Sequence, residues 1–322
     1  MTRRERRCEP PRTLVRPVAV DPTGATGPTR GQARGSGWRR TTRGLFVPAA
    51  TPETVEQRIL EQSMLLPDVG AVSGWAALRL HGAAFCDGLA EDGRTRLPVP
   101  LVVPPGSDLR ERRGVVRHRA FLDSAEIEIR AGIPVARAAR ALLDATCWAK
   151  DLEDAVVLTD IALAAGLVSK AEFGEYLVGR AGHRGVARAR RALELADERT
   201  LSPLETRLRM IWMLDAELPR PRCNWPVADA LGHRIGRPDL LCEELAVIGE
   251  FDGADHRTAF TQREDVRKEE RYRDAGLECF RVVGVDLRDR SLVVRRMRAA
   301  VARSYEAQRP RRWLVRQNPG PL

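Results

Sequence analysis

The stretch GRPDLLCEELAVIGEFDG, residues 236–253, decides how the second half of the chain folds. It contains two short segments rich in Leu, Ile and Val, joined by acidic, turn-like residues, and this pattern predicts a β-hairpin. Side chains two positions apart on a strand point to the same face, so Glu250 and Asp252 are expected to share one face. If the strands pair, Asp239 near the end of the first strand joins them.

Three carboxylates that converge in an otherwise apolar sheet are costly unless a cation or protons neutralise them. A hard divalent cation with oxygen ligands suits such a group, and the stretch therefore predicts a site for Mg²⁺ or Mn²⁺. A plainer interpretation is also open. The segment Glu250–Gly253 can simply end a strand in an Asp-Gly turn, and His256 can be a surface or helix-capping residue.

The order of these residues resembles the core of the PD-(D/E)xK nucleases. In that core an aspartate is followed, about ten residues later, by an acidic residue at the end of an apolar strand, and here the first element is literally Pro238-Asp239. Downstream come Asp252-Gly253, His256, and Lys268 on a predicted helix. These features are similar to a compact nuclease-like family related to Vsr, the very-short-patch mismatch repair endonuclease. The resemblance runs from about Leu201 to the C-terminus.

The resemblance implies a fold class for this part of the chain. It implies an α/β domain with a restriction-endonuclease-like three-layer sandwich and a mixed central sheet. Ser202, Pro203 and Glu205 give the start signals of its first helix, and a second helix is expected at 263–275.

The resemblance also implies roles for individual residues in metal-dependent hydrolysis of DNA. The metal ligands would be Asp239, Glu250, Asp252 and Glu205. His256 would act as base or acid, and Lys268 would be a relocated catalytic lysine or a phosphate contact. Arg237 and Arg271 would hold the DNA backbone. The departure from the family pattern is that Asp252 stands where the lysine is expected, so either the ligand set is a variant one or the activity is lost.

Residues 44–195 carry a second resemblance. A predicted short helix begins at Ser73 and ends at Gly82, two strands follow at 97–103 and 114–119, and Pro134-Val135 leads into a helix with Arg140, Leu142, Leu143 and Asp144. These landmarks are similar to the AbiEi-type antitoxin family, which implies a DNA-binding regulator and a partner toxin. The winged-helix segment that usually precedes them in that family is not evident in this sequence.

Together these patterns predict four parts. Residues 1–43 are rich in Arg, Pro and Gly and are expected to be a disordered basic tail. Residues 44–150 are expected to form the antitoxin-like α+β domain, smaller and helix-rich with a few strands. A helical bridge is expected at 151–200 and the nuclease-like domain at 201–322.

Bulk properties restrict the class of protein. The net charge is +10 and 43% of residues are hydrophobic, which permits real cores and favours a polyanionic partner such as DNA. No stretch approaches the roughly 20 apolar residues that cross a bilayer, and the N-terminus lacks the apolar middle of a secretory signal, so we expect a cytoplasmic protein without a membrane partner. The six cysteines stand far apart, and neither zinc nor disulfides are expected.

Three functions therefore compete. The first is a Mg²⁺- or Mn²⁺-dependent DNA endonuclease or nickase in repair or genome defence. The second is a non-catalytic DNA-binding regulator with a degenerate nuclease fold, acting with a toxin. The third is a protein-interaction module. The sequence does not indicate an oligomeric state.

Overall fold

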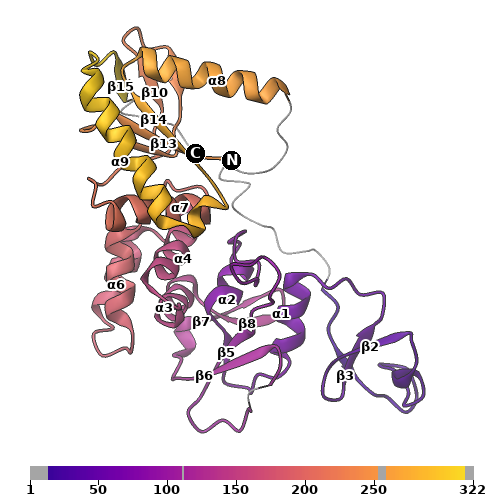
Figure 1. The fold of residues 1–322 in the computed structure, drawn as a ribbon. Helices are drawn as coiled ribbons and strands as arrows, with labels where there is room; N and C mark the ends of the chain where they lie inside the picture. Colours follow the sequence, from indigo (N-terminus) through magenta and orange to yellow (C-terminus); the bar gives the residue numbers. More distant parts are fainter. Residues whose placement is uncertain (1–13, 111, 253–258, 316–322) are drawn as a thin grey trace. The chain divides into compact units, whose positions relative to one another are not determined.

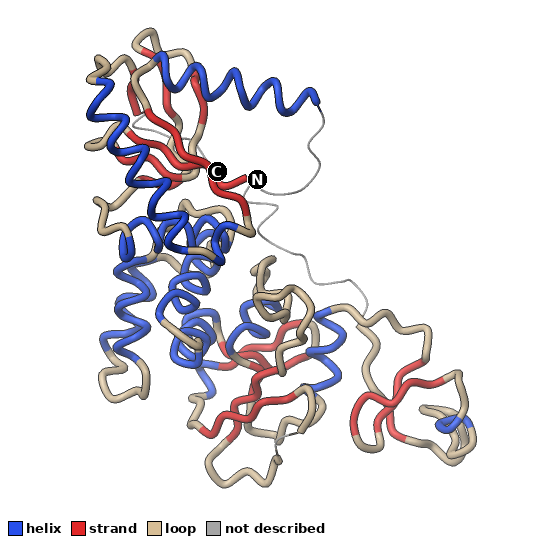
Figure 2. The backbone as a smooth tube through the Cα atoms, in the orientation of Figure 1, coloured by secondary structure: helices blue, strands red, loops and turns tan. Residues whose placement is uncertain are grey.

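The computed structural model describes residues 14–110, 112–252 and 259–315, and of residues 259–266 it describes the backbone alone (Figure 1). The chain divides into two compact units, with the boundary between Glu194 and Leu195. Both units mix helices with open sheets, and the two are described separately below (Figure 2).

The N-terminal unit is built on a mixed five-stranded sheet with the order β6-β5-β4-β8-β7. Its strands are β4 (Ala71–Val72), β5 (Val99–Val103), β6 (Val115–Arg119), β7 (Ile127–Arg130) and β8 (Ile133–Ala136). Every residue of β5 is buried, and the other strands of the core bury Val72, Val115 and Val135. The predicted strands at 97–103 and 114–119 thus correspond to β5 and to β6, which forms one edge of the sheet.

The same unit contains helices, and the first two α-helices along the chain contact the strands of this sheet. The helices are α1 (Val55–Ser63), α2 (Gly74–Leu80), α3 (Ala138–Trp148), α4 (Leu152–Ala164), α5 (Lys170–Val178) and α6 (Val186–Leu195). The region expected to be a separate helical bridge supplies α4 and α5, which belong to the N-terminal unit. The pattern Thr51-Pro52-Glu53 predicts a helix that is capped by Thr51, but the cap lies three residues later, because Thr54 is the N-cap of α1 and its side chain accepts from the backbone N–H of Gln57.

The expectation of a disordered tail up to residue 43 is wrong for residues 14–43. These residues include β1 (Val18–Ala19) and β2 (Trp38–Thr42), which pair with opposite sides of β3 (Leu45–Pro48). The sheet is tied to α1 by side chains: Arg39 donates to both oxygens of Glu61, at 3.0 and 2.7 Å, and Gln57 bonds the backbone N–H and carbonyl of Val15. Few apolar residues are needed here because polar side chains fix the segment.

The C-terminal unit is built on a four-stranded sheet with the order β14-β13-β12-β9. The strands are β9 (Arg222–Cys223), β12 (Leu240–Cys242), β13 (Val247–Asp252) and β14 (Glu278–Val283). The predicted hairpin is confirmed, because β12 and β13 are antiparallel with Leu240 opposite Gly249. Strand β14 runs parallel to β13, so the sheet is mixed.

Both faces of this sheet are covered. On one face, Leu240, Val247 and Phe280 pack with residues of α7 (Pro203–Met210), the following π-helical turn Ile211–Asp215, and α9 (Arg290–Ala307). Figure 1 shows α9 lying along the strands. On the other face, Leu241 and Ile248 pack with Tyr272 of α8 (Ala259–Asp274) and with a small sheet of β10 (Val227–Asp229), β11 (Arg234–Gly236) and β15 (Trp313–Val315).

Substitution of Gly249 in β13 tests this packing. The Cβ that a Gly249→Ala substitution adds would lie 2.5 Å from Cζ of Phe280, inside the core that α9 covers. Overpacking of this kind costs about 1–3 kcal/mol, so we expect Gly249→Ala to lower the free energy of unfolding by that amount in denaturant titration. Gly284→Ala is the control, since its nearest contact would be an ordinary 3.8 Å to Phe251. Equal stability of the two variants would contradict the packing described.

Candidate functional site

The hairpin of the C-terminal unit brings Asp239 and Glu250 together. Asp239 directly precedes β12, and its Oδ2 accepts a hydrogen bond of 2.6 Å from the backbone N–H of Phe251. Glu250 directly precedes Phe251 on β13. Its side chain lies on the same face of the strand as that of Ile248, because side chains alternate along a strand. The carboxyl of Asp239 is therefore fixed at the end of the hairpin, on the partner strand of Glu250.

Lys268 reaches this pair from helix α8. Its Nζ lies 2.8 Å from Oε1 and 2.9 Å from Oε2 of Glu250, so the ammonium contacts both carboxylate oxygens. Both side chains are partly buried, with 27% of the lysine and 19% of the glutamate exposed. The only lysine of the C-terminal unit thus contacts Glu250, one of the carboxylates that the sequence predicts as metal ligands.

Glu205 on α7 is the third carboxylate. The cap predicted at Ser202 is confirmed, because the Ser202 side chain accepts from the backbone N–H of Glu205. The Oε2 atom of Glu205 accepts from the backbone N–H of Leu201 at 2.9 Å and from Nδ2 of Asn224 at 2.8 Å. Asn224 is bonded in turn, through its backbone N–H, to the carbonyl of Asp239 at 3.2 Å. Neutral donors therefore hold Glu205 in place beside the hairpin.

The electrostatics of the group show that the three carboxylates are close enough to interact. Burial, together with the negative charges of Glu205 and Glu250, raises the pKa of Asp239 to about 8. The hydrogen bond from Phe251 and the charge of Lys268 oppose this rise but do not cancel it. At neutral pH, Asp239 in this structure therefore holds a proton that a bound cation would displace.

Tyr272 adds a buried hydroxyl to this group. It lies one turn after Lys268 on α8, with 1% of the residue exposed, and its hydroxyl makes no hydrogen bond to any residue that the structure describes. Burial and then the charge of Glu250 raise its pKa, so the phenol is neutral. Tyr272 was not predicted from the sequence, although its i+4 spacing from Lys268 places both on one helix face.

The other predicted site residues are placed less closely. Asp252 ends β13 on the face of Glu250, as expected from the alternation. Arg237 is partly buried beside Pro238, and Arg271 is exposed on α8, where its Nε donates to the carbonyl of Arg267. His256 lies outside the described residues. Within the described residues, no three His, Cys, Asp or Glu side chains are arranged closely enough to form a metal site as they stand.

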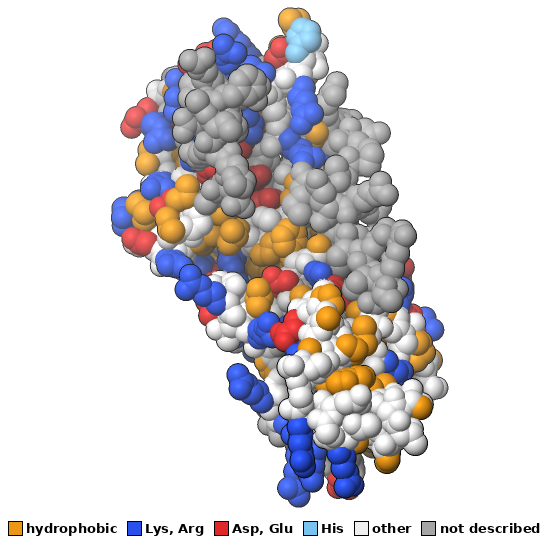
Figure 3. Space-filling view, turned by 90° about the vertical axis from the view of Figure 1, so that its right-hand side faces the viewer, with side chains coloured by type: hydrophobic (Ala, Val, Ile, Leu, Met, Phe, Trp, Pro, Cys, Tyr) orange, Lys and Arg blue, Asp and Glu red, His pale blue; other side chains and the backbone are white. Residues whose placement is uncertain are grey.

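Basic side chains are distributed over the surface. On the face shown in Figure 3, Lys and Arg side chains are spread among fewer Asp and Glu side chains. Many arginines are paired with acids in the C-terminal unit, such as Arg296 with Asp286 and Arg303 with Glu278. Residues 1–43 contain 11 arginines and 3 acidic residues, so most of the net charge of +10 belongs to the first part of the chain.

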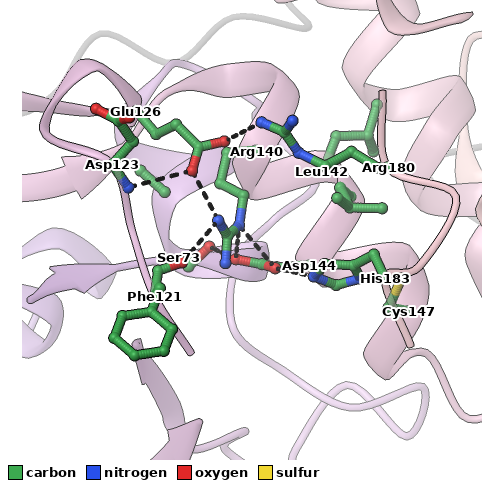
Figure 4. A network of polar contacts seen from close by, with 12 residues as sticks. Ser73, Phe121, Asp123, Glu126, Arg140, Leu142, Asp144, Cys147, Arg180 and His183 are labelled. Atoms are coloured by element: carbon green, nitrogen blue, oxygen red, sulfur yellow. Dashed lines mark hydrogen bonds and ion pairs between the residues drawn. The ribbon is translucent and has the colours of Figure 1, made fainter. Parts of the chain in front are cut away.

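In the N-terminal unit, a buried polar network joins the two sequence landmarks of the antitoxin-like region (Figure 4). The Ser73 hydroxyl does not cap α2 and donates instead to Oδ2 of Asp144, at 2.7 Å. Arg140, 4% exposed, donates from Nε to both oxygens of Asp144 at 3.1 Å and from Nη1 to Glu126 at 2.9 Å. Burial raises the pKa of Asp144 in spite of Arg140. The network thus fixes α2 and α3 against each other.

The pKa of Asp239 gives a stability test. Its folded value is above the unfolded value of 3.8, so between about pH 4 and pH 8 the folded state holds the proton and the unfolded state does not. The stability associated with this group is therefore lost as the pH rises to about 8. We expect Asp239→Asn, which keeps an acceptor for Phe251, to be more stable than the wild type at about pH 8 without divalent cations, and the difference to shrink toward about pH 4.

Thermal unfolding across this pH range measures the difference. Asp274→Asn is the matched control, because Asp274 is exposed at the end of α8. If the Asp239→Asn curve runs parallel to that of the wild type, Asp239 is not held among buried negative charges.

The chain matches no protein-family model, no curated protein and no solved structure. Among the described residues, no helix has both the length and the apolar character needed to cross a membrane.

Proposed function

We propose that the C-terminal unit is a divalent-cation-dependent DNA endonuclease or nickase that hydrolyses phosphodiester bonds. The observation that carries this proposal is that the negative charges of Glu250 and Glu205 act on the buried carboxyl of Asp239, while Lys268 is bound to Glu250. A mixed sheet covered on both faces is compatible with the restriction-endonuclease-like sandwich that we propose for this unit.

Lys268 supplies the feature that the linear motif lacks. The position two residues after Glu250 is Asp252, whereas a PD-(D/E)xK nuclease would carry a lysine there. In the fold, the ammonium of Lys268 reaches the same carboxylate from α8. We therefore assign to Lys268 the role of the relocated lysine, which orients the attacking water and stabilises negative charge on the phosphate.

The donor set fits a hard divalent cation. Asp239, Glu250 and Glu205 offer carboxylate oxygens, and the raised pKa of Asp239 shows that their negative charges are not fully neutralised by the protein. When bound, Mg²⁺ or Mn²⁺ would polarise the phosphate and lower the pKa of water. Rotation of the Asp239, Glu250 and Glu205 side chains would complete the ligand set, with Asp252 on the same face of β13.

The remaining groups would bind DNA. Arg237 directly follows β11 and directly precedes Pro238-Asp239, and Arg271 is exposed one turn after Arg267 on α8. Both lie on elements that carry the carboxylates or Lys268, so we assign them to phosphate contacts. His256 keeps its proposed role as acid or base at neutral pH.

A second candidate function rests on the N-terminal unit. The bond between Ser73 and Asp144 joins two landmarks that this region shares, by resemblance, with AbiEi-type antitoxins. In this alternative the protein is a DNA-binding regulator with a toxin as partner, and the carboxylates of the C-terminal unit are structural. DNA binding that weakens steeply with salt and needs no divalent cation would favour it.

The first test is cleavage. Incubation of supercoiled plasmid with the full chain and Mg²⁺ or Mn²⁺ is expected to give nicked or linear product. Asp239→Ala, Glu250→Gln and Lys268→Met are each expected to lower the initial rate at least about a hundredfold, since each removes a charge on which the transition state depends. The rate is read from the conversion of supercoiled plasmid on gels.

Glu270→Gln controls for the loss of one carboxylate, because Glu270 is exposed on the same helix as Lys268. It should cleave at the wild-type rate. Cleavage by Asp239→Ala equal to that by the wild type would remove the assignment.

The second test is cation binding without DNA. Calorimetric titration of Mn²⁺ into the wild type is expected to show binding that Glu250→Gln weakens about tenfold or more, because one oxygen ligand loses its charge. Glu270→Gln should bind as the wild type does. Equal affinity of the wild type and Glu250→Gln would show that Glu250 is not a ligand.

A further inference from the structure

The loop that leads into α7 carries Arg199 and is attached to the candidate site. The backbone N–H of Leu201 in this loop donates to Oε2 of Glu205 at 2.9 Å. The amide of Asn224 bridges the two, because its Nδ2 donates to the carbonyl of Arg199 at 3.1 Å and to Oε2 of Glu205 at 2.8 Å. Arg199 therefore lies beside the carboxylates, although neither its position nor its spacing suggested this in the sequence.

The guanidinium of Arg199 is held in place by its neighbours. Its Nη2 donates to the carbonyl of Asn224 at 3.1 Å, and its Cζ lies 5.1 Å from the centroid of the Trp225 ring. Asn224 adopts the left-handed conformation, with φ of 55°, which asparagine tolerates better than most residues. Its backbone N–H bonds the carbonyl of Asp239 while its own carbonyl accepts from Arg199. The arginine is thus attached to the hairpin as well as to α7.

Arg237 is a second cation at the same place. It is partly buried two residues before Asp239. Burial lowers the pKa of Arg199, and the positive charge of Arg237 lowers it further, while the charges of Asp197 and Glu198 oppose the change. The two guanidinium groups are therefore close enough to repel each other.

Among the described residues, no acid forms an ion pair with Arg199 or Arg237. Asp197 accepts from the backbone N–H of Arg199 at 2.9 Å, and the Nε of Arg199 is buried without a hydrogen bond to a described residue. Arg222 differs in this respect. Its Cζ lies 4.7 Å from the centroid of the same Trp225 ring, but its Nε is paired with Glu243 at 2.5 Å.

We propose that Arg199 and Arg237 together bind one phosphate of the DNA backbone, next to the phosphate that the proposed nuclease would cleave. The inference rests on the proposed function and adds Arg199 to it. Two neighbouring guanidinium groups without an acidic partner match a phosphate in charge and in the geometry of their donors. Because Asn224 attaches Arg199 to both Glu205 and Asp239, a strand held there would be positioned relative to the carboxylates.

Binding of DNA without divalent cations tests the proposal. The full chain is titrated into a fluorescein-labelled duplex in EDTA at several salt concentrations, and anisotropy gives the association constant. The logarithm of this constant falls with the logarithm of salt concentration by about 0.9 for each phosphate contacted. The double variant Arg199→Ala/Arg237→Ala is therefore expected to have a slope smaller in magnitude by about 0.9. Each single variant is expected to bind about tenfold more weakly at fixed salt.

Arg222→Ala is the matched control. It removes a guanidinium from the same tryptophan, but one whose charge is paired, so the slope should equal that of the wild type. The side chain of Arg237 has no bond to a described residue that could be lost. Arg237→Ala therefore carries the test alone if thermal unfolding shows that Arg199→Ala is misfolded.

Several outcomes would overturn the proposal. They are no DNA binding by the wild type, an unchanged slope in the double variant, and an equal change in Arg222→Ala. A fall of about 1.8 would mean that the arginines contact two separate phosphates, which also contradicts the shared site. Plasmid cleavage by the wild type with an unchanged slope in the double variant would remove this inference and leave the nuclease. The expected fall in slope without cleavage would do the reverse.

Discussion

The C-terminal unit depends on one electrostatic constraint: carboxylates from separate elements lie close together in a partly buried place. Folding brings Asp239 against the backbone of β13, with Glu250 on the same strand and Glu205 on α7. Such a group is costly unless it is neutralised. The structure meets part of this cost with the ammonium of Lys268, the amide of Asn224 and a proton on Asp239. Under the proposed function, a divalent cation would complete this neutralisation.

In the N-terminal unit, by contrast, nearly all of the buried charged side chains are paired. Arg140 bonds Asp144 and Glu126, while Glu126 also accepts from Arg180 at 2.7 Å and from the hydroxyl of Tyr176. A network of this kind, once closed, specifies one arrangement of the helices that contribute to it. Nearby, Arg117, Arg119 and Arg188 donate to backbone carbonyls instead of to acids.

Much of the fold could be predicted from local patterns. The hairpin at 240–252 and the cap at Ser202 each depend on residues close in sequence, and the structure shows both. The sheet of residues 18–48 was not predicted, because its order comes from polar contacts such as Arg39 with Glu61, 22 residues apart. Composition alone made this segment look disordered. The helix start at Thr54 was misplaced because Thr51 and Pro52 offer a competing cap of the same kind.

For the candidate site, the sequence identifies the acids better than it identifies their partners. Asp239 and Glu250 follow from strand alternation, but the contact of Lys268 with Glu250 spans 18 residues and depends on how α8 packs over the sheet. Gly236 shows how closely that packing is set, because a Cβ there would lie 2.2 Å from the Tyr272 hydroxyl and 3.0 Å from Cε of Lys268. Only a residue without a side chain lets α8 approach β11 this closely. Gly236 therefore helps to place Lys268 beside Glu250. This is why the ammonium group is present at the site in space although the linear motif lacks a lysine.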